Sequence, residues 1–414
     1  HKLTNDKVKR IKDERKQLAE AYHKSLNLKI YKELSLMSLS NLYVSKYFPI
    51  VSFEIDSQKL VDTDYSILNK LANISNVNQV VVAPKYEVKA QAYSCRGYEV
   101  MNAIDEIENG TLTGRGVVAG VIDIGILDKD NPNFEGKNVI VRNHPTFIEM
   151  EDSHATYMGA LIGGTYGVAR NATILSVQEF LNLTGEFDWL IDNNVDVVNM
   201  SIGDNPNGLY KQTSATVDYM IRNYGITCCT SAGNYTIANG SYICNPGMAY
   251  NSVTVGNGTS NYYIDSGSCY MEQVDVSKPT ITNYGTYADL PDIDDTMEGT
   301  SLACALTTGA VALLMEEDPT LKLYPARVTA LLTACSYMTP NHDYYDDSYL
   351  DDKVGSGFVD FGRAKENITN YVDIPTNSSH TNGSEIYVGR FYIAEGQKIR
   401  ISLCWLAHST GTVN

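Results

Sequence analysis

The sequence predicts a doubly wound α/β domain built on a parallel sheet, and three observations lead to this prediction. Apolar runs of strand length, such as Val117–Gly125 (VVAGVIDIG), are hydrophobic on both faces, as strands of buried parallel sheets are. These runs alternate with apolar helical segments over the middle of the chain. Asp123, Ser201 and Asn234 each lie near the carboxyl end of such a run, where open α/β sheets place their sites.

The expected elements follow from the same patterns, taken in chain order. Short apolar runs rich in β-branched residues predict strands, and longer periodic segments predict helices. After Val117–Gly125, the expected strands are 172–180, 195–202 and 226–232, with further strands at 253–255 and around 281. The expected helices begin at His154, Phe187, Ser214, Ser301 and Pro325.

Residues 1–43 form an expected basic helical extension. Apolar side chains recur near helical spacing among charged ones over residues 3–37, namely Leu3, Val8, Ile11, Leu18, Ala21 and Tyr22. Residues 1–40 contain ten Lys/Arg and five Asp/Glu, so they carry +5 while the rest of the chain carries −22. Such an extension is expected to dock electrostatically on the acidic body, and the acidic body disfavours nucleic-acid binding.

Residues 44–93 predict a small βαβ unit. A strand is expected over Tyr47–Ile55, a helix over Tyr65–Ile74 and a second strand over Asn78–Val88. A unit of roughly 45 residues buries too little apolar surface to be very stable alone. We therefore expect it to lean on the main body.

Residues 371–414 predict a linker and the start of a β-sandwich-like domain. A polar, turn-rich segment around Pro375 precedes two expected antiparallel strands, Tyr387–Ile393 and Lys398–Leu406. Two strands alone do not make a stable sheet. The C-terminal domain is therefore expected to be cut short or to be completed by a piece not shown.

Ser301 is the leading candidate nucleophile. The segment Glu298–Ala305 (EGTSLACA) brings it through a Gly-Thr turn to the first turn of an apolar helix. The unpaired amides and positive dipole end of such a helix favour negative charge developing beside the serine. A serine before an apolar run is more often only a cap. The segments upstream therefore decide between the two interpretations.

Asp123, His154, Ser301 and Asn234 form a constellation suited to acyl transfer. A catalytic serine needs a base to take its proton, a carboxylate to orient that base and a donor for the oxyanion. Each residue alone has a simpler interpretation: a strand-ending cap, a structural histidine, a capping serine or a turn. Their joint occurrence in these contexts favours chemistry.

Five segments together resemble the subtilisin-like serine proteases, the subtilases or peptidase family S8, over residues 94–340. They are VIDIG at Asp123, SHATYMGALIGG at His154, VVNMSIG at Ser201, TSAGN at Asn234 and EGTSLACA at Ser301. The resemblance implies Asp123 as orienter, His154 as general base and acid, and Ser301 as nucleophile. It implies an oxyanion hole from Asn234 and the Ser301 amide, in the order Asp, His, Ser.

The resemblance also implies how substrate binds. A peptide or protein substrate would lie as an added strand along Ser201, Ile202 and Gly203, and Gly233 would line the pocket beside the scissile bond. Residues 44–93 resemble the inhibitory propeptide of the family, so the chain would inhibit itself until cleavage after Tyr93, before Ser94. Tyr93 would then fill the first specificity pocket, which predicts a preference for large aromatic or apolar residues before the scissile bond.

The sequence also bears on metal binding, on localisation and on the cysteines. The short loop after the His154 helix lacks the acidic and amide ligands that bind calcium in many relatives, so no cofactor or metal is expected and calcium is not supported. No run is long enough for a membrane span, and family resemblance suggests secretion. Cys228, Cys229 and Cys304 lie in apolar contexts that favour buried thiols, whereas Cys244 and Cys269 are candidates for a pair.

Two other functions compete with a secreted, self-inhibited endopeptidase. A catalytically silent relative could keep its propeptide clamped and serve as a binding or scaffolding module. A lipase-like hydrolase is a poorer fit, because no G-x-S-x-G elbow surrounds Ser301.

Overall fold

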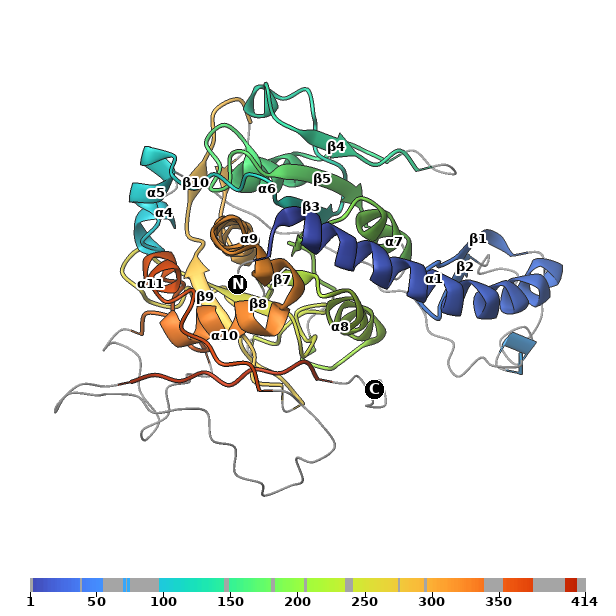
Figure 1. Ribbon diagram of the computed structural model, residues 1–414. Coiled ribbons are helices and arrows are strands. Elements are labelled where there is room, and N and C mark those ends of the chain that lie inside the picture. Colours follow the sequence, from blue (N-terminus) through green and yellow to red (C-terminus); the bar gives the residue numbers. More distant parts are fainter. Residues whose placement is uncertain are drawn as a thin grey trace, which may run out of the picture.

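A seven-stranded parallel sheet organises the fold, in the order β4-β5-β3-β6-β7-β8-β9 (Figure 1). This computed structural model describes residues 3–37, 39–54, 70–71, 73–74, 97–144, 149–179, 183–204, 207–234, 241–274, 276–293, 296–338, 353–374 and 399–407. The strands are β3 (Val118–Asp123), β4 (Val139–Val141), β5 (Thr173–Gln178), β6 (Val197–Met200), β7 (Thr227–Ser231), β8 (Val253–Gly258) and β9 (Ile281–Tyr284). The doubly wound parallel sheet is confirmed; β4 at its edge was not predicted.

Helices cover both faces of the sheet. The described α-helices are α1 (Asn5–Leu34), α4 (Gly97–Val100), α5 (Ile104–Asn109), α6 (Ser153–Gly163), α7 (Thr184–Asp192), α8 (Gln212–Tyr224), α9 (Thr300–Glu317), α10 (Pro325–Cys335) and α11 (Phe361–Glu366). Short 3-10 turns span Ser35–Met37, Pro132–Phe134 and Pro319–Leu323, and a small hairpin joins β10 (Ala288–Asp289) to β11 (Thr296–Met297).

Each face of the sheet has its own hydrophobic core, because successive side chains of a strand point to opposite faces. Val121 of β3 packs in the core that contains α6 and α9, whereas its neighbour Ile122 packs in the core that contains α7 and α8. Val197 and Val198 of β6 divide in the same way. This two-sided burial explains why the strands read as continuous apolar runs.

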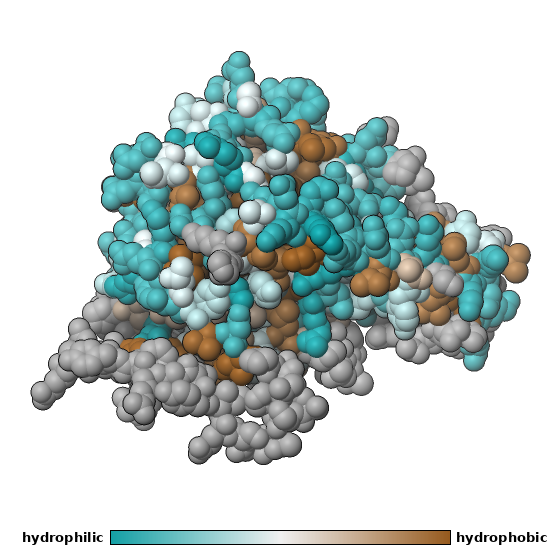
Figure 2. Space-filling model, in the orientation of Figure 1, coloured by the Kyte–Doolittle hydropathy of each residue, from teal (hydrophilic) through white to brown (hydrophobic). Residues whose placement is uncertain are grey.

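The N-terminal helix is confirmed as α1, but its predicted apolar face is wrong. Leu18 and Tyr22 are 75% and 72% exposed, and Figure 2 shows apolar residues on this outer part of the molecule. The buried positions are Val8, Lys12, His23, Asn27 and Leu34, spaced along one side of the helix. Most of the buried face is therefore polar, and apolar periodicity cannot find such a face.

The small unit after α1 is described only in part. β1 (Ser40–Val44) pairs antiparallel with β2 (Val51–Glu54). β2 lies within the expected first strand, whereas β1 was not predicted and straddles the expected boundary at residue 43. Most of the expected helix and the whole expected second strand, as well as Tyr93 and Ser94, lie outside the described residues.

The expected C-terminal strand over Lys398–Leu406 is wrong where the structure describes it. Residues 399–407 are assigned to no strand. The backbone of this segment joins the body through side chains instead: Ala407 N–H donates to Asn251 Oδ1 (2.7 Å), and Arg222 donates to the Leu406 carbonyl (2.6 Å). Its exposed side chains still alternate, which is the pattern that suggested a strand. The expected strand at 387–393 lies outside the described residues.

Candidate active site

The Asp123 and His154 side chains meet in the interior. Asp123 is the last residue of β3, and His154 lies in the first turn of α6. His154 Nδ1 is 2.8 Å from Asp123 Oδ1, and both side chains are buried. Because an ionised carboxylate only accepts hydrogen bonds, Nδ1 carries the hydrogen. The neutral imidazole then holds its basic lone pair on Nε2.

Asp152 fixes the position of His154. Its carboxylate caps α6 by accepting the backbone N–H of His154 at 2.8 Å and of Ala155 at 3.4 Å. Gly125 lets the segment after β3 approach this cap, because a Cβ there would lie 2.5 Å from Asp152 Cβ. The imidazole is thus held from its backbone as well as from its ring.

Ser301 lies where the sequence predicted it, in the first turn of α9. The preceding Gly299 has φ +105°, a region that favours glycine, and a Cβ on it would meet Asn234 Nδ2 at 2.7 Å. As the second residue of α9, Ser301 has a backbone N–H without an acceptor inside the helix. α9 packs against α6, the helix that His154 opens. Contact between the His154 and Ser301 side chains remains a prediction.

The Asn234 side chain has a defined orientation. Its Oδ1 accepts hydrogen bonds from Thr300 N–H and from Thr300 Oγ1, both at 2.8 Å. Thr300 Oγ1 in turn accepts from the backbone N–H of Gly233 at 3.1 Å. Because two donors face Oδ1, Nδ2 is the amide atom on the other side, beside the start of α9. Asn234 is therefore held as a hydrogen-bond donor, the role that an oxyanion hole needs.

Ser201 and Ser301 are joined in both directions. Ser201 Oγ donates to the Ser301 carbonyl (3.1 Å), and Ser301 Oγ donates to the Ser201 carbonyl (3.4 Å). Asn199 extends this network, since its Nδ2 donates to Ser201 Oγ (2.9 Å) and its Oδ1 accepts from Thr308 of α9 (3.2 Å). β6 and α9 are thus fixed to one another beside the nucleophile.

The packing around Gly203 and Gly233 explains why both positions are glycine. A Cβ on Gly203 would lie 2.8 Å from Cys244 Cβ, and one on Gly233 would meet Cys244 Sγ. Both glycines therefore make room for one cysteine. Cys244 and Cys269 are free thiols, and a hydrogen bond with Cys269, together with burial, raises the pKa of the Cys244 thiol. The predicted burial of Cys228, Cys229 and Cys304 is confirmed.

The side chain of Glu179 provides a second carboxyl group near Asp123. Glu179 follows β5, and its backbone N–H donates to the Asp123 carbonyl at 2.7 Å. Burial and the charge of Asp123 raise the pKa of Glu179 to about 7. Glu179 was not predicted from the sequence, where a glutamate at the end of an apolar run was the signal.

Potential metal ligands coincide with the acyl-transfer residues. In the part of the chain that the structure describes, Asp123, Asp152 and His154 bring ligand atoms within 4.8 Å of one another. Asp123 and Asp152 already accept the hydrogen bonds described above, which fits a histidine positioned for proton transfer. A requirement for calcium or another metal stays untested.

The structure thus adds three positioning residues that the sequence did not single out: Asp152, Asn199 and Thr300. Asp152 was detectable as a helix cap two residues before His154. Asn199 and Thr300 carry no comparable signal, because Thr308 and Asn234, which bond to them, are remote in sequence. No helix among the described residues has the length and apolar character for crossing a membrane.

Comparison with known sequences points to one family. A sequence model described as the subtilase family matches residues 59–357. The extracellular serine proteinase of Thermus sp. (strain Rt41A) is 30% identical over 248 residues, 56% of this chain and 57% of that protein. The alkaline proteinase of Hapsidospora chrysogena is 28% identical over 244 residues, 55% of this chain and 59% of that protein. The chain therefore spans a little under three fifths of the length of these relatives.

Solved structures share the fold. Fervidolysin from Fervidobacterium pennivorans, a keratinolytic enzyme related to subtilisin, superposes with a TM-score of 0.53 at 20% identity, covering 69% of this chain and 51% of that one. The prenylagaramide maturation protease PagA superposes with a TM-score of 0.52 at 18% identity, covering 64% of this chain and 98% of that one. At these identities the likeness concerns the fold.

Proposed function

The chain belongs to the subtilase family, and from this premise we propose that it is a serine endopeptidase using Asp123, His154 and Ser301. The buried hydrogen bond between Asp123 and His154 carries the proposal, because it gives the imidazole the tautomer that a general base needs. Its position at the start of α6, packed on the helix of Ser301, supports the same role.

The proposed reaction begins with proton transfer. His154 Nε2 takes the proton of Ser301 Oγ as the oxygen attacks the scissile carbonyl carbon, and Asp123 stabilises the imidazolium. The imidazolium then donates that proton to the leaving amine, which gives an acyl-enzyme on Ser301. Water, activated by His154, hydrolyses the ester and restores the serine.

Asn234 and the Ser301 amide would stabilise the tetrahedral oxyanion. The orientation of Asn234 by Thr300 supports this role, because two hydrogen bonds fix Oδ1 and leave Nδ2 as the donor. One such preorganised donor contributes about 3–4 kcal/mol to transition-state stabilisation. The helix start adds the partial positive charge of its unpaired amides.

Substrate and maturation belong to the same proposal. Peptide or protein substrates would pair with Ser201–Gly203, and Gly233 would line the first specificity pocket. The chain would be a secreted precursor, inhibited by residues 44–93 and cleaving itself between Tyr93 and Ser94. The enzyme would then favour large aromatic or apolar residues before the scissile bond, and a peptide library in which Arg or Asp dominates at that position would contradict this preference.

An active-site probe tests the proposed activity. A fluorophosphonate should label the wild-type protein, and a fragment beginning at Ser94 should appear on a gel. Ser301→Ala should abolish both, whereas Ser336→Ala, a buried serine outside the site, should keep both. Two results together would instead indicate the silent scaffolding module: a wild-type chain that does not cleave itself, and a body without residues 1–93 that the probe does not label.

A further inference from the structure

Two cysteines are hydrogen-bonded to the chain that leads to Asn234. Cys244 donates its backbone N–H to the Ala232 carbonyl (3.0 Å), and Cys269 donates its own to the Gly233 carbonyl (2.9 Å). Both cysteine side chains are fully buried. Because Asn234 is the next residue, the backbone itself fixes the two cysteines beside the proposed oxyanion donor.

The two sulfur atoms meet over Gly233. A Cβ on Gly233 would collide with Cys244 Sγ and would lie 3.3 Å from Cys269 Sγ. The two thiols are also hydrogen-bonded to each other. Gly233 has φ +110°, a region that favours glycine. The fold therefore brings two thiols into contact at a position where any side chain on residue 233 would displace them.

The segments that carry the two cysteines already pair with one another. Ile243 N–H donates to the Met271 carbonyl (2.8 Å), and Tyr270 N–H donates to the Ser241 carbonyl (2.9 Å). Tyr242 and Met271 form a parallel bridge between these hydrogen bonds. A disulfide needs two backbones that are close together. Here the backbones are held close without it, so joining the sulfurs requires little movement.

The other buried cysteines of the described chain are arranged differently. Cys228 and Cys229 are successive residues of β7, so their side chains point to opposite faces of the sheet and lie in different cores. Cys304 of α9 shares the core of Cys229. Cys229 and Cys304 are therefore the competing pair, against which an assignment to Cys244 and Cys269 can be tested.

We propose that Cys244 and Cys269 form a disulfide when the chain folds under oxidising conditions, and that this bond fixes the wall of the first specificity pocket. The bond rests on the contacts above, whereas its effect on the pocket rests on the proposed function. In this structure both residues are thiols, so the two forms differ by one covalent bond.

The oxidation proceeds by exchange with a small-molecule disulfide such as oxidised glutathione. One cysteine loses its proton and attacks a sulfur of that molecule, which forms a mixed disulfide and releases one thiolate. The second cysteine, also deprotonated, then attacks the mixed disulfide and displaces the second thiolate. The two released thiolates take up the two protons, so two protein thiols are oxidised and one small disulfide is reduced to two thiols.

Burial determines when the bond forms. A hydrogen bond with Cys269 and burial raise the pKa of the Cys244 thiol well above its ordinary value. Because the thiolate is the reacting species, a thiol that is buried and protonated is inert. The exchange therefore takes place during folding, before the two segments close over the sulfurs. Once folded, the reduced and oxidised forms both persist, and an oxidising secretory route favours the disulfide.

Gly203 connects the cysteine pair to the segment proposed to bind substrate. A Cβ on Gly203 would lie 2.8 Å from Cys244 Cβ and 3.3 Å from Cys244 Sγ. Cys244 thus contacts this segment and the chain before Asn234 at the same time. A bond from Cys244 to Cys269 restricts both walls of the pocket. Asp123 and His154 belong to β3 and α6 instead, so the bond should change substrate binding more than the chemical step.

The first experiment detects the bond without relying on catalysis. The full Ser301→Ala chain is unfolded with denaturant and reductant, and is refolded either with oxidised and reduced glutathione or with reductant alone. Mass spectrometry of a non-reducing digest should find Cys244 linked to Cys269 in the first preparation and not in the second. Unlinked cysteines, or a Cys229–Cys304 link in place of the expected one, would overturn the proposal. If the chain does not refold, production in the periplasm and in the cytosol of a bacterial host supplies the two forms.

Two variants test which cysteines matter for stability. The disulfide closes a loop of about 26 residues, so the oxidised form should melt about 5 °C or more above the reduced form. Cys269→Ser should abolish this difference. Cys335→Ser, a buried cysteine at the end of α10, is the control and should keep it. A difference in Tm that survives Cys269→Ser would contradict the assignment.

The processed wild-type enzyme tests the effect on the pocket. For a peptide with Tyr before the scissile bond, KM should be about threefold lower or more in the oxidised form, with kcat within about twofold. Cys269→Ser prepared in both ways should show a single KM. Equal KM values for the two wild-type forms would overturn the role of the pair in the pocket. An inactive wild-type enzyme with the bond mapped would count against the proposed function alone.

Discussion

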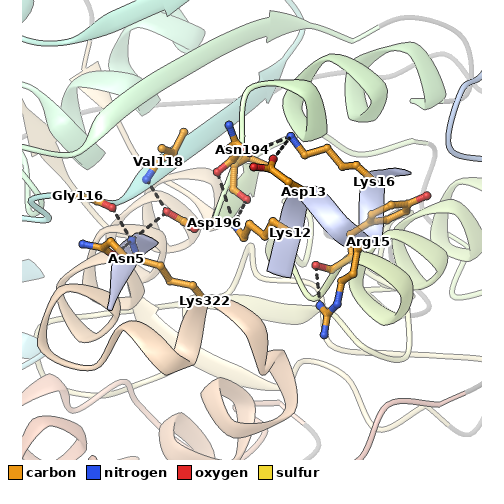
Figure 3. Close-up of polar contacts among 12 residues, drawn as sticks. Asn5, Lys12, Asp13, Arg15, Lys16, Gly116, Val118, Asn194, Asp196 and Lys322 are labelled. Atoms are coloured by element: carbon orange, nitrogen blue, oxygen red, sulfur yellow. Dashed lines mark hydrogen bonds and ion pairs between the residues drawn. The ribbon is translucent and has the colours of Figure 1, made fainter. Parts of the chain in front are cut away.

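At each of the two edges of the sheet, a buried carboxylate pairs with a basic side chain, but we expect the two pairs to have different roles. At the carboxyl edge, buried Asp123 pairs with His154 at 2.8 Å; at the amino edge, buried Asp196 pairs with Lys12 at 2.6 Å (Figure 3). A free imidazole has a pKa near 6.5 and gains and loses a proton around neutral pH, whereas a free ammonium has a pKa near 10.4. Burial lowers the pKa of Lys12, but the charge of Asp196 and its hydrogen bond oppose that shift. The partner of the carboxylate, more than its burial, therefore separates a reacting site from a holding one.

The two pairs also differ in which parts of the chain they join. Asp123 and His154 are 31 residues apart, within the main body. Lys12 and Asp196 are 184 residues apart and join α1 to that body. Substitutions at the first pair are expected to change rate, and substitutions at the second to change stability.

The largest expected effect is at the carboxyl edge. Asp123→Asn keeps the shape of the side chain but favours the wrong imidazole tautomer, so kcat on a peptide with Tyr before the scissile bond should fall about 10⁴-fold. The midpoint of urea unfolding should change little. Asp196→Asn is the matched control and should show the reverse: lower stability with kcat retained per folded molecule.

Loss of the amino-edge cation comes next. Lys12→Ala removes one partner of a buried ion pair and should lower the free energy of unfolding of uncut Ser301→Ala protein by about 3 kcal/mol. Urea unfolding followed by tryptophan fluorescence measures it. Lys24→Ala, whose cation pairs with Glu20 on the exposed side of α1, should cost less than about 0.5 kcal/mol. Equal losses would remove the distinction between the two faces of α1.

A smaller effect is expected where the oxyanion donor is oriented. Thr300→Val removes the hydroxyl that holds Asn234 Oδ1 but keeps the backbone N–H, so kcat should fall about tenfold with KM nearly unchanged. Thr329→Val, which removes a hydroxyl that donates to the Pro325 carbonyl within α10, is the control. A fall in both variants would indicate general loss of packing.

The smallest effect concerns pH. Because burial and Asp123 raise the pKa of Glu179 to about 7, above its unfolded value near 4.5, the native state binds this proton more tightly. Its contribution to stability is full below about pH 4.5 and is lost as the pH rises through 7. The change in the free energy of unfolding caused by Glu179→Gln should therefore be more favourable at pH 8 than at pH 5, by on the order of 1 kcal/mol. Unfolding of the variant and of the wild type at both pH values measures it.

The sequence predicted the carboxyl edge far better than the amino edge. Asp123 ends an apolar strand, and Ser201 and Asn234 lie one and three residues beyond the ends of two others, and strand ends are visible in a linear pattern. Lys12 looks like any solvated lysine, because its burial depends on Asp196, far along the chain. Leu18 and Tyr22 were predicted to face the body because they are apolar, but they are exposed. Which side of α1 is buried depends on partners far along the chain.

The remaining errors have a similar cause. Residues 399–407 alternate as a strand does, but side-chain contacts with Asn251 and Arg222 hold this backbone in place of a described neighbouring strand. The orientation of Asn234 was likewise invisible, since it depends on Thr300, 66 residues away. Long-range partners, which a linear pattern does not specify, account for each of these differences.

Cys244 occupies space that Gly203 and Gly233 leave open from two sides. Its sulfur therefore acts as a spacer between the segment expected to bind substrate and the one that leads to Asn234. A wider group at residue 244 would wedge these segments apart, and a narrower one would let them close. The spacing of these two segments thus depends on a residue that is itself buried.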